Sequence, residues 1–303
     1  MAFDKLKSPY PYFGGKSRVA PIVWKALGNV SNYIEPFAGS IAVLLANPNP
    51  AKIETINDID CQLTNFWRSV SKNPQEVAKY AIYPVNEVEL HARHRYLISI
   101  SEDLNAKMEQ DIDYIDVKAA GYWVYGISNS VGNNWLQPKG LNAMPILSSA
   151  GGGISGLTAN PIIDFELLMN RLKRVRVLCG DYKRILTPSV TYKNVGISSK
   201  DVSGIFLDPP YCKKNRDKVY IKDEDIFEEV CKFAIENGEN EKLRIAVCGY
   251  DDGIVFPDNW QKFAWKSNGG LANLGDNQGR INSNKETIWF SPHCLKIKDD
   301  EKI

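Results

Sequence analysis

The sequence predicts a single α/β domain with a Rossmann-like, doubly wound sheet and an insertion near its middle. Segments of strand and helix character alternate over residues 17–72 and again after residue 164, an order typical of a parallel sheet covered by helices. Between residues 84 and 162 this alternation stops and the composition changes. A chain of 303 residues has the length of one large domain that carries such an insertion.

The expected elements follow from apolar spacing and from the Gly, Pro, Asn and Asp residues that interrupt it. Before the insertion, we expect helices over 17–27, 40–47 and 61–72, a strand that ends at Pro36, and a strand over 52–57. After the insertion, we expect helices over 166–174 and 223–230, and strands over 175–180, 204–208, 243–250 and 286–291.

The insertion is expected to be partly helical, with helices over 87–100 and 117–127. It continues as a long stretch rich in Gly, Asn and Ser, and loops of this length are uncommon unless they are functional or disordered. The embedded Trp135, Leu136 and Met144 favour a binding loop. We therefore expect a main domain formed by residues 1–83 and 163–303 and an inserted domain at residues 84–162.

Composition indicates an ordinary globular protein, with 44% apolar residues, 24% charged residues and a net charge of +1. No apolar stretch approaches the ~20 residues that cross a bilayer, and the first ten residues have no apolar h-region, so we expect no secretory signal. The six cysteines are scattered and form no C-x-x-C pair, so we expect reduced thiols, no metal site and a cytoplasmic location.

Polar groups follow four expected strands, where ligands bind in open parallel sheets. They are Glu35 and Gly39, Asp58, Asp181 with Tyr182, and the run from Asp208 to Tyr211. The turn EPFAGS lacks the G-x-G-x-x-G fingerprint, so a dinucleotide is poorly supported. Several acids along one crevice suit a nucleoside that carries an amino acid.

The motifs PYFGGK (11–16), YIEPFAGSIAVLL (33–45), IND (56–58), CGDY (179–182) and LDPPY (207–211) occur in this order. In that order the chain resembles the Dam-type, or D12-class, DNA adenine methyltransferases. RIAVCGY (244–250) and ETIWFSPHCL (286–295) resemble phage and prophage members. The resemblance implies a Rossmann-like methyltransferase fold, with residues 84–162 as its target-recognition domain. The implied reaction is methyl transfer from S-adenosyl-L-methionine to the N6 amino group of adenine in double-stranded DNA.

The resemblance also implies the residues that bind the methyl donor: Tyr12, Lys16, Glu35, Phe37, Gly39, Asp58, Asp181, Tyr182 and Asp208. Asp58 would bind the ribose hydroxyls. Asp181 would accept from the adenine amino group of the donor, and Tyr182 would lie against its ring. The second glycine of the family's EPF-x-G-x-G turn is replaced here by Ile41.

The LDPPY run has a direct chemical rationale. An exocyclic amine is a poor nucleophile because its lone pair is delocalised into the base, and two acceptors on its N–H groups free that lone pair. Asp208 and the Pro209 carbonyl would supply them, while Pro209 and Pro210 fix the turn. Tyr211 offers a ring on which a flipped base can stack. Direct transfer needs no covalent intermediate, so Cys212 is expected to be a bystander.

Basic and amide side chains are the expected DNA contacts, because they bind phosphates and read base edges. The candidates are Arg93, Arg95, Asn129, Asn133, Asn134, Gln137, Lys213, Lys214, Arg216, Lys218 and Arg280. We expect a monomer or weak dimer on DNA, in a bacterial cell or phage-infected host. The sequence leaves open whether the enzyme belongs to a restriction–modification system, acts without a restriction partner or protects a phage genome.

Two alternatives stay open from the sequence. The same chemistry serves the N4 amine of cytosine in DNA, and Ile41 leaves room for a DNA-binding relative that has lost catalysis. RNA or protein glutamine methylation is disfavoured, because those relatives show Asn in place of Asp208.

Overall fold

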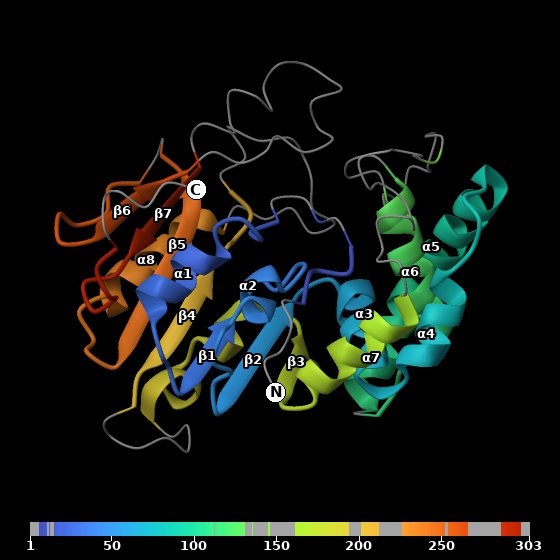
Figure 1. The fold of residues 1–303 in the computed structure, drawn as a ribbon, viewed down its shortest axis with the longest axis horizontal. Coiled ribbons are helices and arrows are strands. Elements are labelled where there is room, and N and C mark those ends of the chain that lie inside the picture. The colour runs from blue at the N-terminus through green and yellow to red at the C-terminus, as the bar shows by residue number, and fades with distance from the viewer. Residues whose placement is uncertain are drawn as a thin grey trace.

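The computed structural model describes residues 6–10, 12, 15–111, 113–130, 135, 145, 161–193, 201–211, 226–251, 254–265 and 286–297. Their strands form one seven-stranded sheet of order β3-β2-β1-β4-β5-β7-β6 (Figure 1). The strands are β1 Asn32–Glu35, β2 Ile53–Asp58, β3 Val175–Cys179, β4 Ser203–Leu207, β5 Leu243–Tyr250, β6 Gln261–Ala264 and β7 Glu286–Phe290.

The sheet is mostly parallel, and its arrowheads in β1, β2, β4 and β5 point the same way in Figure 1. The order β3-β2-β1-β4-β5 is that of a doubly wound sheet. Strands β2 and β3 are added on one side of β1 and strands β4 and β5 on the other, and such sheets bind ligands at this switch between β1 and β4. Strand β7 runs antiparallel to both neighbours, so its first residue, Glu286, pairs with Tyr250 at the end of β5. The predicted Rossmann-like fold class is confirmed.

Eight α-helices lie within the described residues. They are α1 Ala20–Leu27, α2 Ala42–Leu45, α3 Cys61–Lys72, α4 Pro74–Ala81, α5 Glu87–Gln110, α6 Val117–Asn129, α7 Pro161–Leu172 and α8 Phe227–Asn237. Side-chain caps explain several helix starts: Asp60 accepts from backbone N–H groups of α3, and Asn86 and Asp116 do so at α5 and α6.

Alternate side chains of the central strands pack into two cores. Phe206 of β4 and Ala246 of β5 belong to a core that includes α1, whereas Ile205 and Leu207 belong to one that includes α8. This alternation is the period-two geometry of a strand buried on both faces. The sheet is therefore the middle layer of the domain. The carboxyl ends of its parallel strands lie along one edge and continue into loops.

Helices α3 to α7 gather beside the β3 edge of the sheet (Figure 1). Leu97 of α5 and Trp123 of α6 belong to the same core cluster as Trp67 of α3. The described part of residues 84–162 thus shares its core with the rest of this helical group. The boundaries of an inserted target-recognition domain stay a prediction.

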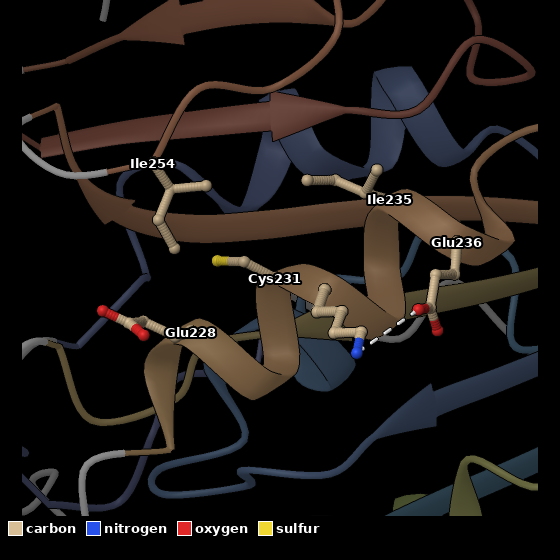
Figure 2. Close-up of a pocket in the computed structure, with 6 residues that line it drawn as sticks. Glu228, Cys231, Ile235, Glu236 and Ile254 are labelled. Atoms are coloured by element: carbon tan, nitrogen blue, oxygen red, sulfur yellow. Dashed lines mark ion pairs between the residues drawn. The ribbon is translucent and has the colours of Figure 1, made fainter.

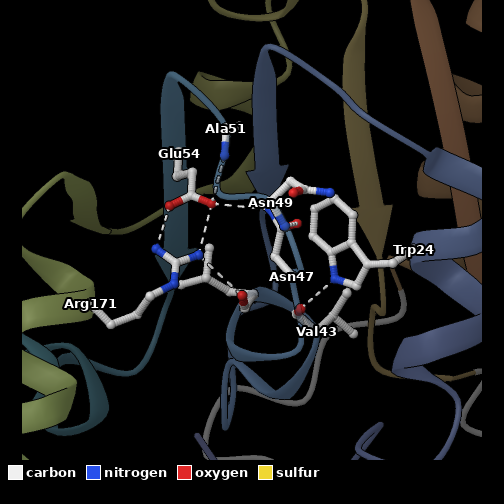
Figure 3. A network of polar contacts seen from close by, with 8 residues as sticks. Trp24, Val43, Asn47, Asn49, Ala51, Glu54 and Arg171 are labelled. Atoms are coloured by element: carbon white, nitrogen blue, oxygen red, sulfur yellow. Dashed lines mark hydrogen bonds and ion pairs between the residues drawn. The ribbon is translucent and has the colours of Figure 1, made fainter. Parts of the chain in front are cut away.

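A buried ion pair connects α7 to the sheet (Figure 3). The guanidinium of Arg171 bonds both oxygens of Glu54 on β2, at 2.5 and 2.8 Å, and donates to the carbonyl of Leu44 at 3.1 Å. The Arg171 and Glu54 side chains are only 4% and 2% exposed. This contact fixes where the chain re-enters the sheet after the insertion. Among the described helices, none has the length and apolar character needed to cross a membrane.

Candidate active site

The turn after β1 is built around Gly39. This residue has a left-handed backbone with φ of 44°, and its N–H donates to Asp58 Oδ2 at 3.0 Å. Its carbonyl accepts from the Tyr10 hydroxyl at 2.9 Å and from Trp67 Nε1 at 3.3 Å. A Cβ at this position would lie 2.7 Å from Cε1 of the Tyr12 ring. Only glycine fits both the backbone conformation and the close ring.

Asp58, at the end of β2, is oriented by backbone donors on both oxygens. Oδ2 accepts from Gly39 and Oδ1 accepts from the N–H of Asp60 at 3.0 Å. Burial raises the pKa of Asp58, and these backbone hydrogen bonds oppose that rise. Because each carboxylate oxygen has further acceptor capacity, Asp58 can still accept from ligand hydroxyl groups.

Asn57 connects three strand ends, and the sequence did not single it out. Its Nδ2 donates to the carbonyls of Pro36 at 3.1 Å and Gly180 at 2.9 Å, after β1 and β3. Within the described residues, its buried Oδ1 has no hydrogen-bond partner. Its position just before Asp58 at a strand end was the available signal.

Two aromatic rings lie beside this turn. The rings of Phe37 and Tyr182 are 5.1 Å apart at an angle of 38°, and the Tyr182 hydroxyl donates to Glu229 at 2.9 Å. Asp181 is exposed, and it caps the short helix Tyr182–Ile185 by accepting from the N–H of Lys183 at 2.8 Å. Flat surfaces and a carboxylate are thus available at the end of β3.

A second group of polar residues lies at the ends of β4, β5 and β7. Lys16 Nζ pairs with Asp208 Oδ2 at 2.9 Å. The Tyr211 hydroxyl lies 3.3 Å from Asp208 Oδ1 and 2.9 Å from Glu286 Oε2. The Tyr211 ring has an edge contact with Tyr250, with centroids 4.6 Å apart. A buried cation thus pairs with Asp208, and one hydroxyl lies between the two carboxylates.

Burial and charge have opposite effects on the pKa values of this second group. Burial alone would lower the pKa of Lys16, but Asp208 and Glu286 raise it above its ordinary value. Burial raises the pKa of Asp208, and the neighbouring Lys16 opposes that rise. Burial also raises the pKa of Glu286, again opposed by Lys16. Lys16 therefore stabilises the ionised form of both carboxyl groups.

Glu35, the last residue of β1, is a further buried carboxyl group with a raised pKa. It is 2% exposed, and burial raises its pKa to about 8 although the Tyr33 hydroxyl donates to it at 2.9 Å. The nearby Asp208 charge adds to the rise. At neutral pH Glu35 is mostly a neutral acid that can donate one hydrogen bond.

Sequence comparison identifies the family. Residues 12–232 match the profile of the D12 class N6 adenine-specific DNA methyltransferases. The chain belongs to this family. It is therefore an adenine-specific DNA methyltransferase, and the predicted enzyme class is confirmed. No curated protein matches the chain in a second comparison.

The matched range of the methyltransferase contains Lys16, Gly39, Asp58, Asp208 and Tyr211, which the structure brings to one edge of the sheet. Glu286 lies beyond that range, and the sequence did not predict it as a site residue. A polar residue that begins a strand usually lies at the opposite edge of a parallel sheet, so the strand-end rule overlooks it. The sequence signal for Glu286 was its charge at the start of the otherwise mostly apolar strand ETIWF.

Ile41 stands where the family has its second glycine, and it keeps the left-handed backbone, with φ of 48°. A β-branched residue is strained in this conformation. Its side chain is fully buried in the core, and this burial offsets the strain. The replaced glycine is therefore accommodated without loss of the turn.

Two expected DNA contacts lie in the interior, and we withdraw them as DNA contacts. Arg93 is 2% exposed, and its guanidinium lies 4.1 to 4.4 Å from three ring centroids, those of Tyr83, Tyr122 and Tyr125. It also bonds Glu89 at 3.1 Å. Asn129 is fully buried and donates to the Tyr125 carbonyl at 2.7 Å. Arg93 also donates to the Tyr80 carbonyl of α4 at 3.0 Å, so it connects α5 to α4 and α6, whereas the Asn129 hydrogen bond lies within α6.

Arg95, by contrast, is exposed on α5. The other expected DNA contacts lie outside the described residues: Asn133, Asn134, Gln137, Lys213, Lys214, Arg216, Lys218 and Arg280. Cys212 lies outside them as well.

A shallow pocket of about 360 Å³ lies on α8, away from both groups (Figure 2). Ile235, Ile254 and Cys231 line it, next to an ion pair of 3.9 Å between Lys232 and Glu236. It contains none of the site residues. In the described part of the chain, no group of three His, Cys, Asp or Glu side chains is arranged to hold a metal ion.

Proposed function

We propose that this methyltransferase transfers a methyl group from S-adenosylmethionine directly to the N6 amine of an adenine flipped out of double-stranded DNA. The observation that carries the proposal is the pairing of Asp208 with Lys16 and Tyr211 after β4, beside the switch between β1 and β4. The Gly39 turn lies at the end of the neighbouring strand, β1. We therefore place the methyl donor at the end of β1 and the target base at the end of β4.

The residues around Gly39 fit S-adenosylmethionine. The Gly39 N–H orients Asp58, which is held to accept from ribose hydroxyls. Phe37 and Tyr182 offer flat surfaces for the adenine ring, and Asp181 can accept from its amino group. When bound, S-adenosylmethionine supplies an electrophilic methyl group on a sulfonium.

The residues after β4 would prepare the amine. Asp208 Oδ1 accepts one N–H and the Pro209 carbonyl accepts the other, so the nitrogen lone pair is freed. Lys16 keeps Asp208 ionised through Oδ2 and leaves the other oxygen for the amine. Stacking on Tyr211 stabilises the flipped base by ~1–3 kcal/mol, which offsets part of the cost of flipping.

DNA recognition is assigned to the inserted region, residues 84–162, and to the basic residues beyond Tyr211. Exposed Arg95 on α5 is the described residue that we propose for phosphate contact. We propose that the enzyme acts as a monomer or weak dimer, because one chain carries both groups of site residues.

The test compares two aspartates at opposite ends of β4. Asp208 follows the strand and Asp201 precedes it; both side chains are 20% exposed, and both pair with a lysine. Purified enzyme is incubated with duplex DNA and S-adenosylmethionine, and the digested nucleosides are identified by mass spectrometry. We expect N6-methyladenine from the wild type and Asp201→Ala and none from Asp208→Ala. N4-methylcytosine, or full activity of Asp208→Ala, would overturn the proposal.

A further inference from the structure

Glu286 is a buried carboxylate with one short contact in the catalytic group. It is 7% exposed, and Oε2 lies 2.9 Å from the Tyr211 hydroxyl. The antiparallel course of β7 brings this first residue beside Tyr250, at the same sheet edge as Asp208. Glu286 lies outside the matched family range of residues 12–232.

We propose that Glu286 is a positioning residue for methyl transfer, which accepts the hydroxyl proton of Tyr211 and so keeps Asp208 Oδ1 free for the target amine. This inference rests on the proposed function, because it assigns Asp208 Oδ1 to the amine.

The argument begins with the single proton of the Tyr211 hydroxyl, which can be donated to one acceptor at a time. The distance to Glu286, 2.9 Å, lies within the ordinary range for O–H···O hydrogen bonds, whereas the 3.3 Å to Asp208 exceeds it. Burial raises the pKa of Tyr211 well above its ordinary value, so the hydroxyl keeps its proton and acts as a donor. The proton therefore goes to Glu286.

The two oxygens of Asp208 then have different partners. Oδ2 is paired with Lys16 at 2.9 Å, and Oδ1 keeps its acceptor capacity because Tyr211 donates elsewhere. Without the Glu286 carboxylate, Asp208 Oδ1 would be the nearest acceptor for the Tyr211 proton. The hydroxyl would then compete with the target amine for the same oxygen.

The inference makes an unusual prediction about two substitutions. Glu286→Leu should lower kcat by about 10-fold to 100-fold, the usual range for loss of a residue that orients a reactive group. The KM for DNA and the Kd for S-adenosylmethionine should change by less than about 3-fold, because Glu286 contacts neither binding group. Adding Tyr211→Phe to Glu286→Leu should raise kcat again, to within about 3-fold of Tyr211→Phe alone, because no hydroxyl remains to compete.

The control is Asp251→Asn, which removes an exposed carboxylate, paired with Lys262, that directly follows β5. It should leave kcat unchanged. Thermal unfolding shows whether each variant is folded. If Glu286→Leu does not fold, Glu286→Gln replaces it, and any fall in its kcat must again disappear when Tyr211→Phe is added.

The outcomes separate this inference from the proposed function. If the wild type makes no N6-methyladenine, the proposed function fails. If the wild type is active but Glu286→Leu has an equal kcat, only the role of Glu286 fails. If Glu286→Leu remains equally impaired after Tyr211→Phe is added, Glu286 does not act through the hydroxyl and the inference is overturned.

Discussion

Replacing Lys16 by methionine should move the acidic limb of the pH–kcat profile to higher pH. Lys16 Nζ lies 2.9 Å from Asp208 Oδ2 in a site where the lysine side chain is 5% exposed. Asp208 must be ionised to accept from the target amine. Burial already raises its pKa and Lys16 opposes that rise, so removing the cation raises the pKa further.

The magnitude follows from the distance. Two unit charges 2.9 Å apart attract by about 6 kcal/mol at an effective dielectric constant of 20. If about a quarter of this attraction is lost from ionised Asp208, the pKa of Asp208 rises by about one unit, and kcat falls by up to about 10-fold at pH values below that pKa. Activity that depends on a carboxylate is present above its folded-state pKa and is lost as the pH falls through it. The loss should therefore be largest at the acidic end of the profile and shrink as the pH rises.

The assay is methyl transfer to duplex DNA at saturating substrates across a pH series. Lys16→Arg keeps the charge and should keep the acidic limb close to that of the wild type. Lys25→Met makes the same substitution on the exposed face of α1 and should leave the profile unchanged. An acidic limb that stays in place, or moves to lower pH, in Lys16→Met would refute the electrostatic role of Lys16.

Three further predictions concern stability, donor binding and DNA binding. Arg171→Met leaves a buried carboxylate without its cation and should lower the unfolding free energy by about 3–5 kcal/mol in urea titrations. A loss below about 1 kcal/mol would contradict that assignment. Gly39→Ala forces a Cβ against a tyrosine ring in a left-handed backbone and should raise the Kd for S-adenosylmethionine at least about 10-fold by calorimetry; an unchanged Kd would contradict the binding role. Arg95→Met should lower the salt dependence of DNA binding by about one ion, whereas Arg93→Met should reduce stability without that change. The reverse result would restore Arg93 as a DNA contact.

Strands whose ends carry strong local signals were predictable from the sequence. Apolar runs that end at or just before Pro36, Asp58 and Asp208 correspond to β1, β2 and β4, because Pro and Asp are disfavoured in strands; Asp58 is itself the last residue of β2. The site residues that directly follow these strands were predictable for the same reason. The position of these site residues depends on where each parallel strand ends, which the local sequence indicates, and not on detailed packing.

Elements that depend on distant contacts were harder to predict. Helix α5 was expected to end near residue 100 but continues to Gln110, where Leu104 and Met108 are buried at helical spacing. Helix α4 and strand β6 were not anticipated, and α4 is held by packing against α6 and α7. The burial of Arg93 depends on three tyrosines, Tyr83 after α4 and Tyr122 and Tyr125 on α6, and no local pattern in the sequence predicts these contacts.

Three described residues of the N-terminal segment, Tyr10, Tyr12 and Lys16, connect the two groups of site residues. Tyr10 and Tyr12 contact the Gly39 turn, and Lys16 pairs with Asp208. A change that moves this segment acts on donor binding and on the catalytic carboxylate together. Glu286 reaches the same carboxylate from β7, at the far side of the central strands, so a change there should alter kcat alone. We therefore expect variants that displace the N-terminal segment to change both the Kd for S-adenosylmethionine and kcat. Variants of Glu286, which redirect the Tyr211 hydroxyl proton, should change kcat alone, so measuring both quantities distinguishes the two effects.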